Sequence, residues 1–295
     1  MAGLEKVVVG IDFSEASLAA ARWAAHWFAP QAELILLHAL DAPRPPAFLQ
    51  PLLPGTEDVL RAARDGALGR LRELANTLPS PQTRVEVREG RATDQIVDVV
   101  EETGADLVVV GEHGHRRGLR DVLGSTAEQL MHTSPVPVLL ARGQRDAAPQ
   151  RVLAPVDESP AGDRVLEWAR LLHERFGARV TALHVLNVRL FWQLRLVSSE
   201  TKWQELGEEM QRGAQEWLRQ RVRAAGLPGE AVDVQVVFGE PSYEILAAAA
   251  RHGSDLIVLA SHGAGALGRI LIGSVARSVL RGASCPVLVV TRGCD

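Results

Sequence analysis

The sequence of 295 residues contains only two cysteines, Cys285 and Cys294, and both lie near the C-terminus. Two such closely spaced cysteines do not provide the disulfide framework of a small secreted protein, so a reducing compartment is favoured. No apolar run is long enough to cross a bilayer, and no signal peptide pattern is present at the start. We therefore expect a cytoplasmic protein that does not bind a membrane.

Lysine is almost absent. Only Lys6 and Lys202 occur among the 32 basic residues, and neither follows a glycine-rich stretch. This excludes the P-loop, which needs GxxxxGK[ST], and no G-x-G-x-x-G fingerprint of a dinucleotide site follows the first apolar run. The net charge of −4 argues against nucleic acid as a partner, because domains that coat nucleic acids carry a basic excess.

The sequence does contain an internal repeat. A glycine pattern, Gly111-x2-Gly114-x9-Gly124-Ser125, returns 149 residues later, with Ala260 at its first position and Gly263, Gly273 and Ser274 at the others. A fixed offset over so many positions indicates a tandem duplication. We predict one domain over residues 1–143, a linker over 144–150 and a second domain over 151–295.

Each half alternates short apolar runs with longer amphipathic segments. Strands that are apolar throughout and alternate with helices predict an α/β fold, a parallel sheet with helices on both faces. The predicted strands are 7–11, 33–40, 84–88, 107–111, 136–141, 151–156, 179–185, 232–238, 256–260 and 287–290. The predicted helices are 14–28, 57–78, 93–102, one from Ser125, one from Pro160, 201–225, 242–251 and one from Ser274.

The glycine pattern joins a buried strand to the start of a helix. A helix N-terminus has unpaired N–H groups and the positive end of the dipole, and nearby glycines let the backbone approach a phosphate closely. Ser125 and Ser274 are expected to cap their helices and to offer a hydroxyl to an anion. A single copy of the pattern is better explained by a turn followed by a helix cap, but its repetition in both halves indicates an anion site.

Each half resembles a universal stress protein domain, and the whole chain resembles the tandem members of that family. The resemblance rests on the strand-end motifs Val-Gly-Ile-Asp12-Phe-Ser and Ala-Pro-Val-Asp157-Glu-Ser, on His38 and His184 at the second-strand ends, and on the G-x2-G-x9-G-[ST] signature. It implies five-stranded parallel sheets in the order 3-2-1-4-5, whose fifth strands pair in an intramolecular pseudo-dimer. A further homodimer and a protein partner are left open.

In ATP-binding members of this family, the signature holds the ribose and phosphates. The strand-end aspartate and the residue after the second-strand histidine line the adenine pocket. The resemblance thus implies ATP, ADP or AMP as ligand, together with Mg²⁺. The implied ligand residues of the first half are Gly10, Asp12, Ala39, Gly111, Gly114, Gly124, Ser125 and Thr126. Those of the second half are Pro155, Asp157, Val185, Ala260, Gly263, Gly273, Ser274 and Val275.

The two halves differ at these positions. Glu112 places a charge inside the first glycine turn, where it opposes phosphates if it points inward. Gly10 and Ala39, in place of Pro155 and Val185, suggest a looser adenine slot in the first half. Ala260 replaces a glycine, at a cost of about 1–2 kcal/mol if that position needs a positive φ. We expect both sites to be usable.

The sequence favours a nucleotide-binding stress-response regulator over an enzyme, because neither half shows a convincing base, nucleophile or metal-carboxylate cluster. A weak ATPase or phosphotransferase and a scaffold with degenerate pockets stay open as alternatives. Arg116, Arg117 and Arg120 either face solvent or contact the phosphates. The aromatic segment 190–197 either folds onto its own domain or contacts a partner.

Overall fold

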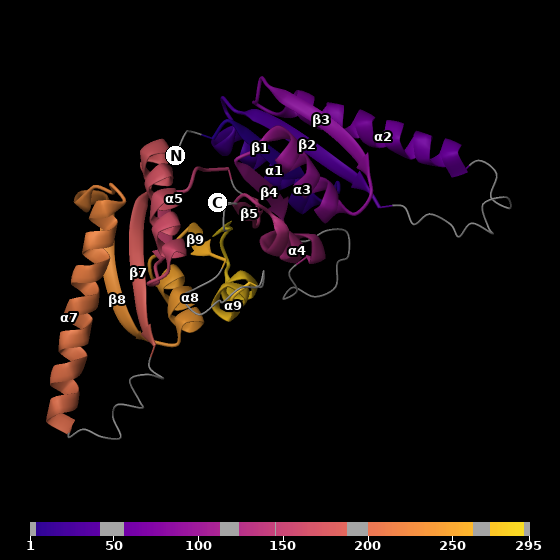
Figure 1. Cartoon of the computed structure of the whole chain (residues 1–295). Helices are drawn as coiled ribbons and strands as arrows, with labels where there is room; N and C mark the ends of the chain where they lie inside the picture. The colour runs from indigo at the N-terminus through magenta and orange to yellow at the C-terminus, as the bar shows by residue number, and fades with distance from the viewer. Residues whose placement is uncertain are drawn as a thin grey trace, which may run out of the picture. The chain divides into compact units, whose positions relative to one another are not determined.

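The computed structural model describes residues 4–41, 56–112, 124–144, 146–187, 200–261 and 272–291. The chain divides into two compact units (Figure 1), the first ending at Ala147 and the second beginning at Ala148. The predicted pairing of the two fifth strands stays a prediction, and the segment 190–197 lies outside the described residues.

The first unit is built on a parallel sheet. Its strands are β1 (Lys6–Gly10), β2 (Glu33–Leu40), β3 (Thr83–Glu89), β4 (Leu107–Gly111) and β5 (Val138–Ala141). Their order is β3-β2-β1-β4-β5, and every neighbouring pair is parallel. The order 3-2-1-4-5 is therefore confirmed. The central strand β1 is closed to solvent: its residues Val7, Val8 and Val9 are 0% exposed.

Helices cover both faces of this sheet. They are α1 (Glu15–Trp23), α2 (Thr56–Thr77), α3 (Ala92–Thr103) and α4 (Ser125–Thr133). A Cβ on Gly10 of β1 would meet Ile96 of α3, whereas a Cβ on Gly111 of β4 would meet Ala16 of α1. Successive strand residues point to opposite faces, and Gly10 lies beside Val110 rather than Gly111, so α1 and α3 pack on opposite faces.

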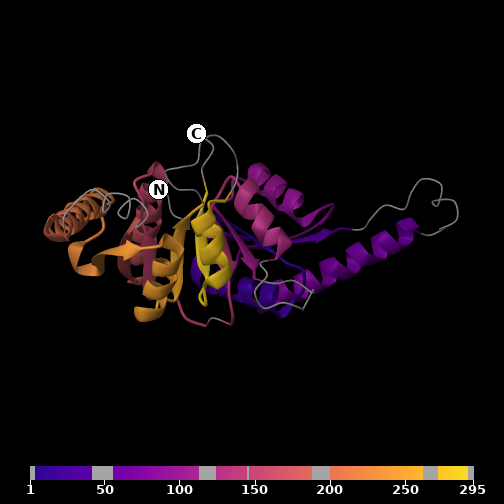
Figure 2. The same ribbon diagram turned by 90° about the horizontal axis from the view of Figure 1, so that it is seen from below.

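Two helices of the first unit are irregular in shape or in burial. The helix predicted to run to residue 28 changes after Trp23 into a π-helical turn, Ala24–Phe28, closed by the Ala29 N–H on the Ala24 carbonyl at 2.8 Å. This wider turn lies in the core, where Trp23 and Phe28 meet edge to face with ring centroids 5.1 Å apart. The first turns of α2, which extend away from the sheet in Figure 2, are exposed at nearly every position from 57 to 66.

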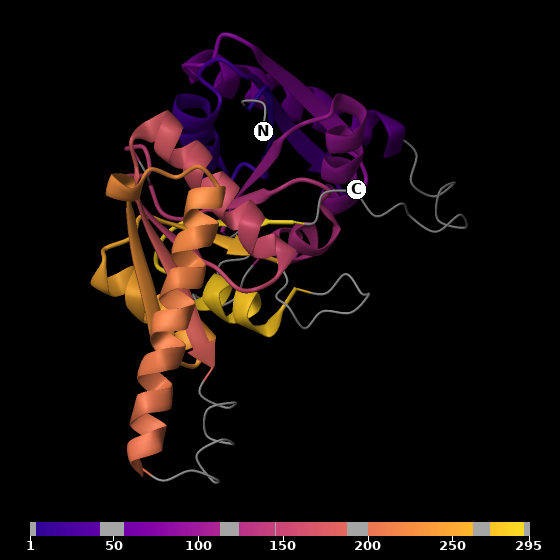
Figure 3. The same ribbon diagram turned by 60° about the vertical axis from the view of Figure 1, so that its left-hand side comes forward.

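The second unit repeats the same design. Its strands are β6 (Arg151–Pro155), β7 (Arg179–Asn187), β8 (Val232–Gly239), β9 (Leu256–Ala260) and β10 (Val287–Val290), in the order β10-β9-β6-β7-β8. Its helices are α5 (Pro160–Phe176), α7 (Glu200–Ala224), α8 (Pro241–Arg251) and α9 (Ser274–Gly282). α7 packs on β7 and β8, and it is the long orange helix of Figure 3. Pro160 takes the first helical position of α5, as predicted.

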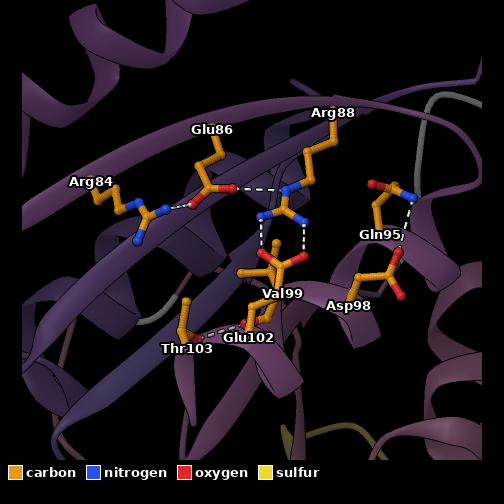
Figure 4. Close-up of polar contacts among 8 residues, drawn as sticks. All are labelled: Arg84, Glu86, Arg88, Gln95, Asp98, Val99, Glu102 and Thr103. Atoms are coloured by element: carbon orange, nitrogen blue, oxygen red, sulfur yellow. Dashed lines mark hydrogen bonds and ion pairs between the residues drawn. The ribbon is translucent and has the colours of Figure 1, made fainter.

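A chain of ion pairs ties the edge strand β3 to α3 (Figure 4). Glu86 binds Arg84 on one side and the Nε of Arg88 on the other, at 2.8 Å. The two terminal nitrogens of Arg88 bind both carboxylate oxygens of Glu102, at 2.8 and 2.6 Å. The hydrogen bond from Arg88 lowers the pKa of Glu102, and the same bond raises the pKa of Arg88. In the second unit, Asp233, Gln235, Val237 and Arg251 occupy the equivalent positions.

Replacing Glu102 with glutamine is expected to lower stability slightly at about pH 7, and this difference is expected to shrink as the pH falls below 4.5. The pKa of Glu102 is lowered in the folded state, so its contribution is present above the unfolded pKa and is lost as pH falls through the folded one. Urea unfolding at several pH values measures this difference. Glu101→Gln, at an exposed neighbour on the same helix, is the control, and equal effects of both changes would contradict the prediction.

Among the described residues, no helix is long and apolar enough to cross a membrane.

Candidate functional site

The candidate sites lie at the carboxyl ends of the central strands. In each unit the order of the sheet reverses between neighbouring strands, β1 and β4 in the first and β6 and β9 in the second. Ligands of open α/β sheets bind at such a switch point. Asp12 follows β1 and Gly111 ends β4, while Asp157 follows β6 and Ala260 ends β9. The fold thus places the same pair of predicted site positions at each switch point.

A glycine opens the helix that follows each glycine turn. Gly124 is the N-cap of α4, with φ −59° and ψ 138°, and Gly273 is the N-cap of α9, with φ −59° and ψ 152°. The Gly124 N–H donates to the Glu112 carbonyl at 3.3 Å, and the Gly273 N–H donates to the Ser261 carbonyl at 2.9 Å. The turn is therefore tied back to the start of the helix in the same way in both units.

This arrangement corrects the predicted role of two serines. Ser125 and Ser274 are the first residues of their helices, and no side-chain cap bond is made at either N-cap in the described structure. The glycines hold the cap position because their extended ψ makes them the last residues before the helix. Both serines are exposed, so an anion in solvent can reach them.

The next backbone N–H groups are the ones that an anion would meet. Within the described ranges, the N–H groups of Ser125, Thr126 and Ala127 make no hydrogen bond, and neither do those of Ser274, Val275 and Ala276. Three such donors at a helix start, with the positive end of the dipole, suit a phosphate.

The strand-end aspartates have a structural role in both units. The Oδ1 atom of Asp12 accepts from the N–H and the hydroxyl of Ser14, at 3.0 and 2.6 Å. Asp157 does the same with Ser159, at 3.2 and 2.5 Å. Ser14 then caps α1 by accepting from the Ser17 N–H at 3.2 Å, as predicted. One carboxylate oxygen of each aspartate thus shapes the entry to the helix that follows the switch-point strand.

A stacked group of side chains, not predicted from the sequence, supports the end of β2. The Nδ1 of His38 lies 2.7 Å from the Ile11 carbonyl, directly before Asp12. The ring of Phe13 lies 4.7 Å from the His38 ring, and the guanidinium of Arg70 lies 3.9 Å from the Phe13 ring centre. Phe13 has φ 63°, a strained value for a bulky residue. The stack therefore holds the turn that carries Asp12.

The second unit builds the equivalent stack from different elements. The Nδ1 of His184 lies 2.8 Å from the Val156 carbonyl, but its ring packs against Trp217 of α7, at 4.8 Å. Arg221 lies 5.2 Å from the Trp217 ring and binds Asp163 and the Ser159 carbonyl. The two histidines were visible in the sequence, whereas Arg70, Trp217 and Arg221 lie on distant helices and gave no sequence signal.

Gly10, which belongs to the first predicted adenine slot, packs closely against its neighbours. A Cβ at this glycine would lie 3.0 Å from Ile96 Cδ1 and 3.2 Å from Val110 Cγ1, so neighbouring side chains already fill that space. Gly10 therefore does not by itself widen the slot. Ala39 of β2 lies on the same face of the sheet as Gly10, and it pairs with Arg88 of β3.

Gly111 is needed for close packing and not for a positive φ. A Cβ here would lie 2.8 Å from the backbone carbon of Ala16 and 2.9 Å from the Ser17 nitrogen. The described part of the chain has only one non-glycine residue with positive φ, Phe13, so Ala260 carries no such strain. The expected cost of alanine at this position is thus absent. α5 carries Gly162 where α1 carries Ser17, and α5 packs on β9, the strand that Ala260 ends.

Glu112 makes an ion pair. Its Oε1 lies 3.1 Å from Nη1 of Arg142, the residue after β5. Gly114, His113 and the arginines at 116, 117 and 120 lie outside the described residues, as do His262 and Gly263. Over the ranges that the structure does describe, no group of three or more His, Cys, Asp or Glu side chains is placed to hold a metal ion.

These features define a class of protein: two tandem doubly wound α/β domains, each with a glycine-led helix start at its switch point. The chain belongs to the universal stress protein family, whose family model matches residues 3–142 and 149–291. A universal stress protein of Mycolicibacterium smegmatis is 28% identical over 304 residues, 96% of each chain. Another, from Methanocaldococcus jannaschii, is 32% identical over 143 residues, 48% of this chain and 82% of its own length.

The fold has the same relatives. The crystal structure of a universal stress protein from Archaeoglobus fulgidus superposes with a TM-score of 0.69. It covers 98% of this chain and 97% of its own at 21% identity. A crystal structure of a universal stress protein therefore has the same fold over nearly the whole length of this chain.

Proposed function

We propose that this universal stress protein binds one adenine nucleotide in each unit and acts as a regulator whose nucleotide occupancy sets its shape or its partners. The observation that carries the proposal is the triplet of open N–H groups after Gly124 and again after Gly273, each in a unit whose switch-point strand is followed by an aspartate. Such a triplet suits the phosphates of ATP, ADP or AMP.

The remaining ligand residues follow from this placement. The phosphates would meet the amides that begin α4 and α9, the hydroxyls of Ser125 and Ser274, and the glycine turns after β4 and β9. The adenine would lie toward Ala39 in the first site and Val185 in the second. Asp12 or Asp157 would face the nucleoside or Mg²⁺. Because the described residues hold no group of three His, Cys, Asp or Glu side chains, these aspartates fit Mg²⁺ only together with phosphates, and Mg²⁺ keeps waters and substrate oxygens as its other ligands.

The sites are better suited to holding a nucleotide than to cleaving it. Fast phosphoryl transfer uses a lysine or arginine on the phosphates and a second carboxylate that positions metal and water. The only lysines are Lys6 and Lys202, and Lys6 binds the Thr103 carbonyl at 2.7 Å, at the opposite end of β1. Slow hydrolysis is the alternative activity, and the first site is its better candidate because Arg116, Arg117 and Arg120 follow its glycine turn.

The purified protein is expected to release an adenine nucleotide when it is denatured by heat, with turnover of added ATP well below roughly 1 s⁻¹. Chromatography and mass spectrometry of the released molecule identify it, and calorimetry on the stripped protein counts two sites per chain. A stripped protein that binds no adenine nucleotide would favour the scaffold. Kinase-like turnover that is lost in Asp12→Ala and Asp157→Ala, with binding kept, would make the protein an enzyme.

A further inference from the structure

One difference between the two units changes the charge at the candidate phosphate site. In the first unit, the residue after β4 is Glu112, whose N–H donates to the Ala141 carbonyl at 3.1 Å and whose carbonyl accepts from Gly124. The residue after β5 is Arg142, and the two side chains form the ion pair at 3.1 Å. The Arg142 side chain is 8% exposed and that of Glu112 is 24% exposed. The arginine is thus the inner member and the glutamate the outer one.

The second unit has the same backbone frame without the charges. Ser261 stands in place of Glu112, and its N–H donates to the Val290 carbonyl at 3.0 Å. Thr291 stands in place of Arg142. Both residues are buried, at 3% and 6% exposed. The backbone hydrogen bonds are the same in both units, so the two units differ here in their side chains and in the charge that these carry.

The ion pair lies on the face of the sheet where the phosphates are expected. The register of β4 and β5 pairs Val110 with Leu140, and Glu112 and Arg142 continue this row two residues later. A Cβ on Gly111 would point the other way, into α1. Glu112 and Arg142 therefore lie on the face opposite α1, which α3 and α4 cover, and Glu112 is bonded through its backbone to the glycine that opens α4.

We infer that Glu112 and Arg142 set the phosphate-number preference of the first site, so that it favours AMP over ATP more than the second site does. The inference rests on the proposed function. The carboxylate of Glu112, the more exposed member of the pair, belongs to the residue that is bonded to the start of α4, so its charge opposes added phosphate charge there. Ser261 and Thr291 bring no charge, so the second site accepts ATP without this penalty.

The experiment compares AMP and ATP at one site at a time, by calorimetry on the stripped full-length chain. Gly273→Glu silences the second site, and Glu112→Gln then removes the charge of the first while keeping the shape of the side chain. The ratio of the AMP dissociation constant to the ATP dissociation constant is expected to rise about tenfold. Glu101→Gln, which removes the same charge from an exposed position of α3, is expected to leave the ratio unchanged.

A reciprocal variant tests the same inference without touching the first ion pair. With Gly124→Glu silencing the first site, Ser261→Glu combined with Thr291→Arg is expected to lower the ratio at the second site by a similar factor. A merely structural role would change the affinities for AMP and ATP equally. An unchanged ratio in Glu112→Gln that still binds nucleotide overturns this inference alone. A wild-type chain that binds neither nucleotide overturns the proposed function and this inference with it.

Discussion

Gly124→Glu is expected to abolish nucleotide binding at the first site, and Gly273→Glu to do the same at the second, each by about 100-fold or more. A side chain at either position would project beside the open N–H groups of the helix start, where its carboxylate takes the place of the phosphate and repels it. Calorimetry should give one site per chain in each single variant and none in the double variant.

The fold is expected to survive these changes. The φ and ψ of Gly124 and Gly273 are allowed for any residue, and a Cβ on Gly124 would have its nearest contact, the Glu112 carbonyl, at 3.2 Å. Gly66→Glu is the matched control, because this exposed glycine of α2 has nothing within 4 Å of a Cβ and lies far from the helix start of α4 in sequence. A double variant that still binds two nucleotides would refute the site assignment.

Gly111→Ala is expected to destabilise the first unit by on the order of 3 kcal/mol. The added Cβ would lie 2.8 and 2.9 Å from two backbone atoms of α1, which cannot rotate away as a flexible side chain would. The helix must shift from the sheet, and the turn that carries Asp12 must shift with it. Native-state hydrogen exchange of the β1 and β4 amides measures the loss in the first unit separately from the second.

Gly69→Ala provides a control of opposite sign. Gly69 is inside α2 and a Cβ there would meet nothing within 4 Å, so alanine should stabilise the helix by roughly 0.5–1 kcal/mol. Gly111→Ala with unchanged exchange in β1 and β4 would show that the contact with α1 is relaxed at little cost.

The sequence was sufficient for the strands and for most helix limits because their apolar runs are long and bounded by glycine and proline. It was insufficient where a contact joins distant segments. The π-helical turn after Trp23 depends on core packing, and the ion pair of Glu112 depends on Arg142, which reaches it only because β4 and β5 are neighbours. The same holds for Trp217, which replaces Phe13 beside the second histidine from a helix far along the chain.

For the candidate site, the sequence located the glycines and aspartates but misjudged what some of them do. The sequence predicted Ser125 and Ser274 as helix N-caps because serine is a favourable N-cap residue. In the structure the preceding glycines are the N-caps, and their N–H groups donate to the carbonyls of Glu112 and Ser261. A positive φ was the usual reason to expect glycine at 111, whereas the actual reason is the closeness of α1, which a one-dimensional pattern does not contain.

The indole of Trp23 shows where the first unit can be separated from the rest of the chain. Its Nε1 donates to the carbonyl of Ala147 at 3.0 Å, and the ring is 3% exposed. A fragment ending at residue 143 would keep the tryptophan in the core but lose its acceptor, at a cost of about 1–3 kcal/mol for a buried donor left without a bond. A version of this half that keeps this hydrogen bond therefore extends through Ala147, and a protease site or fusion joint belongs after it.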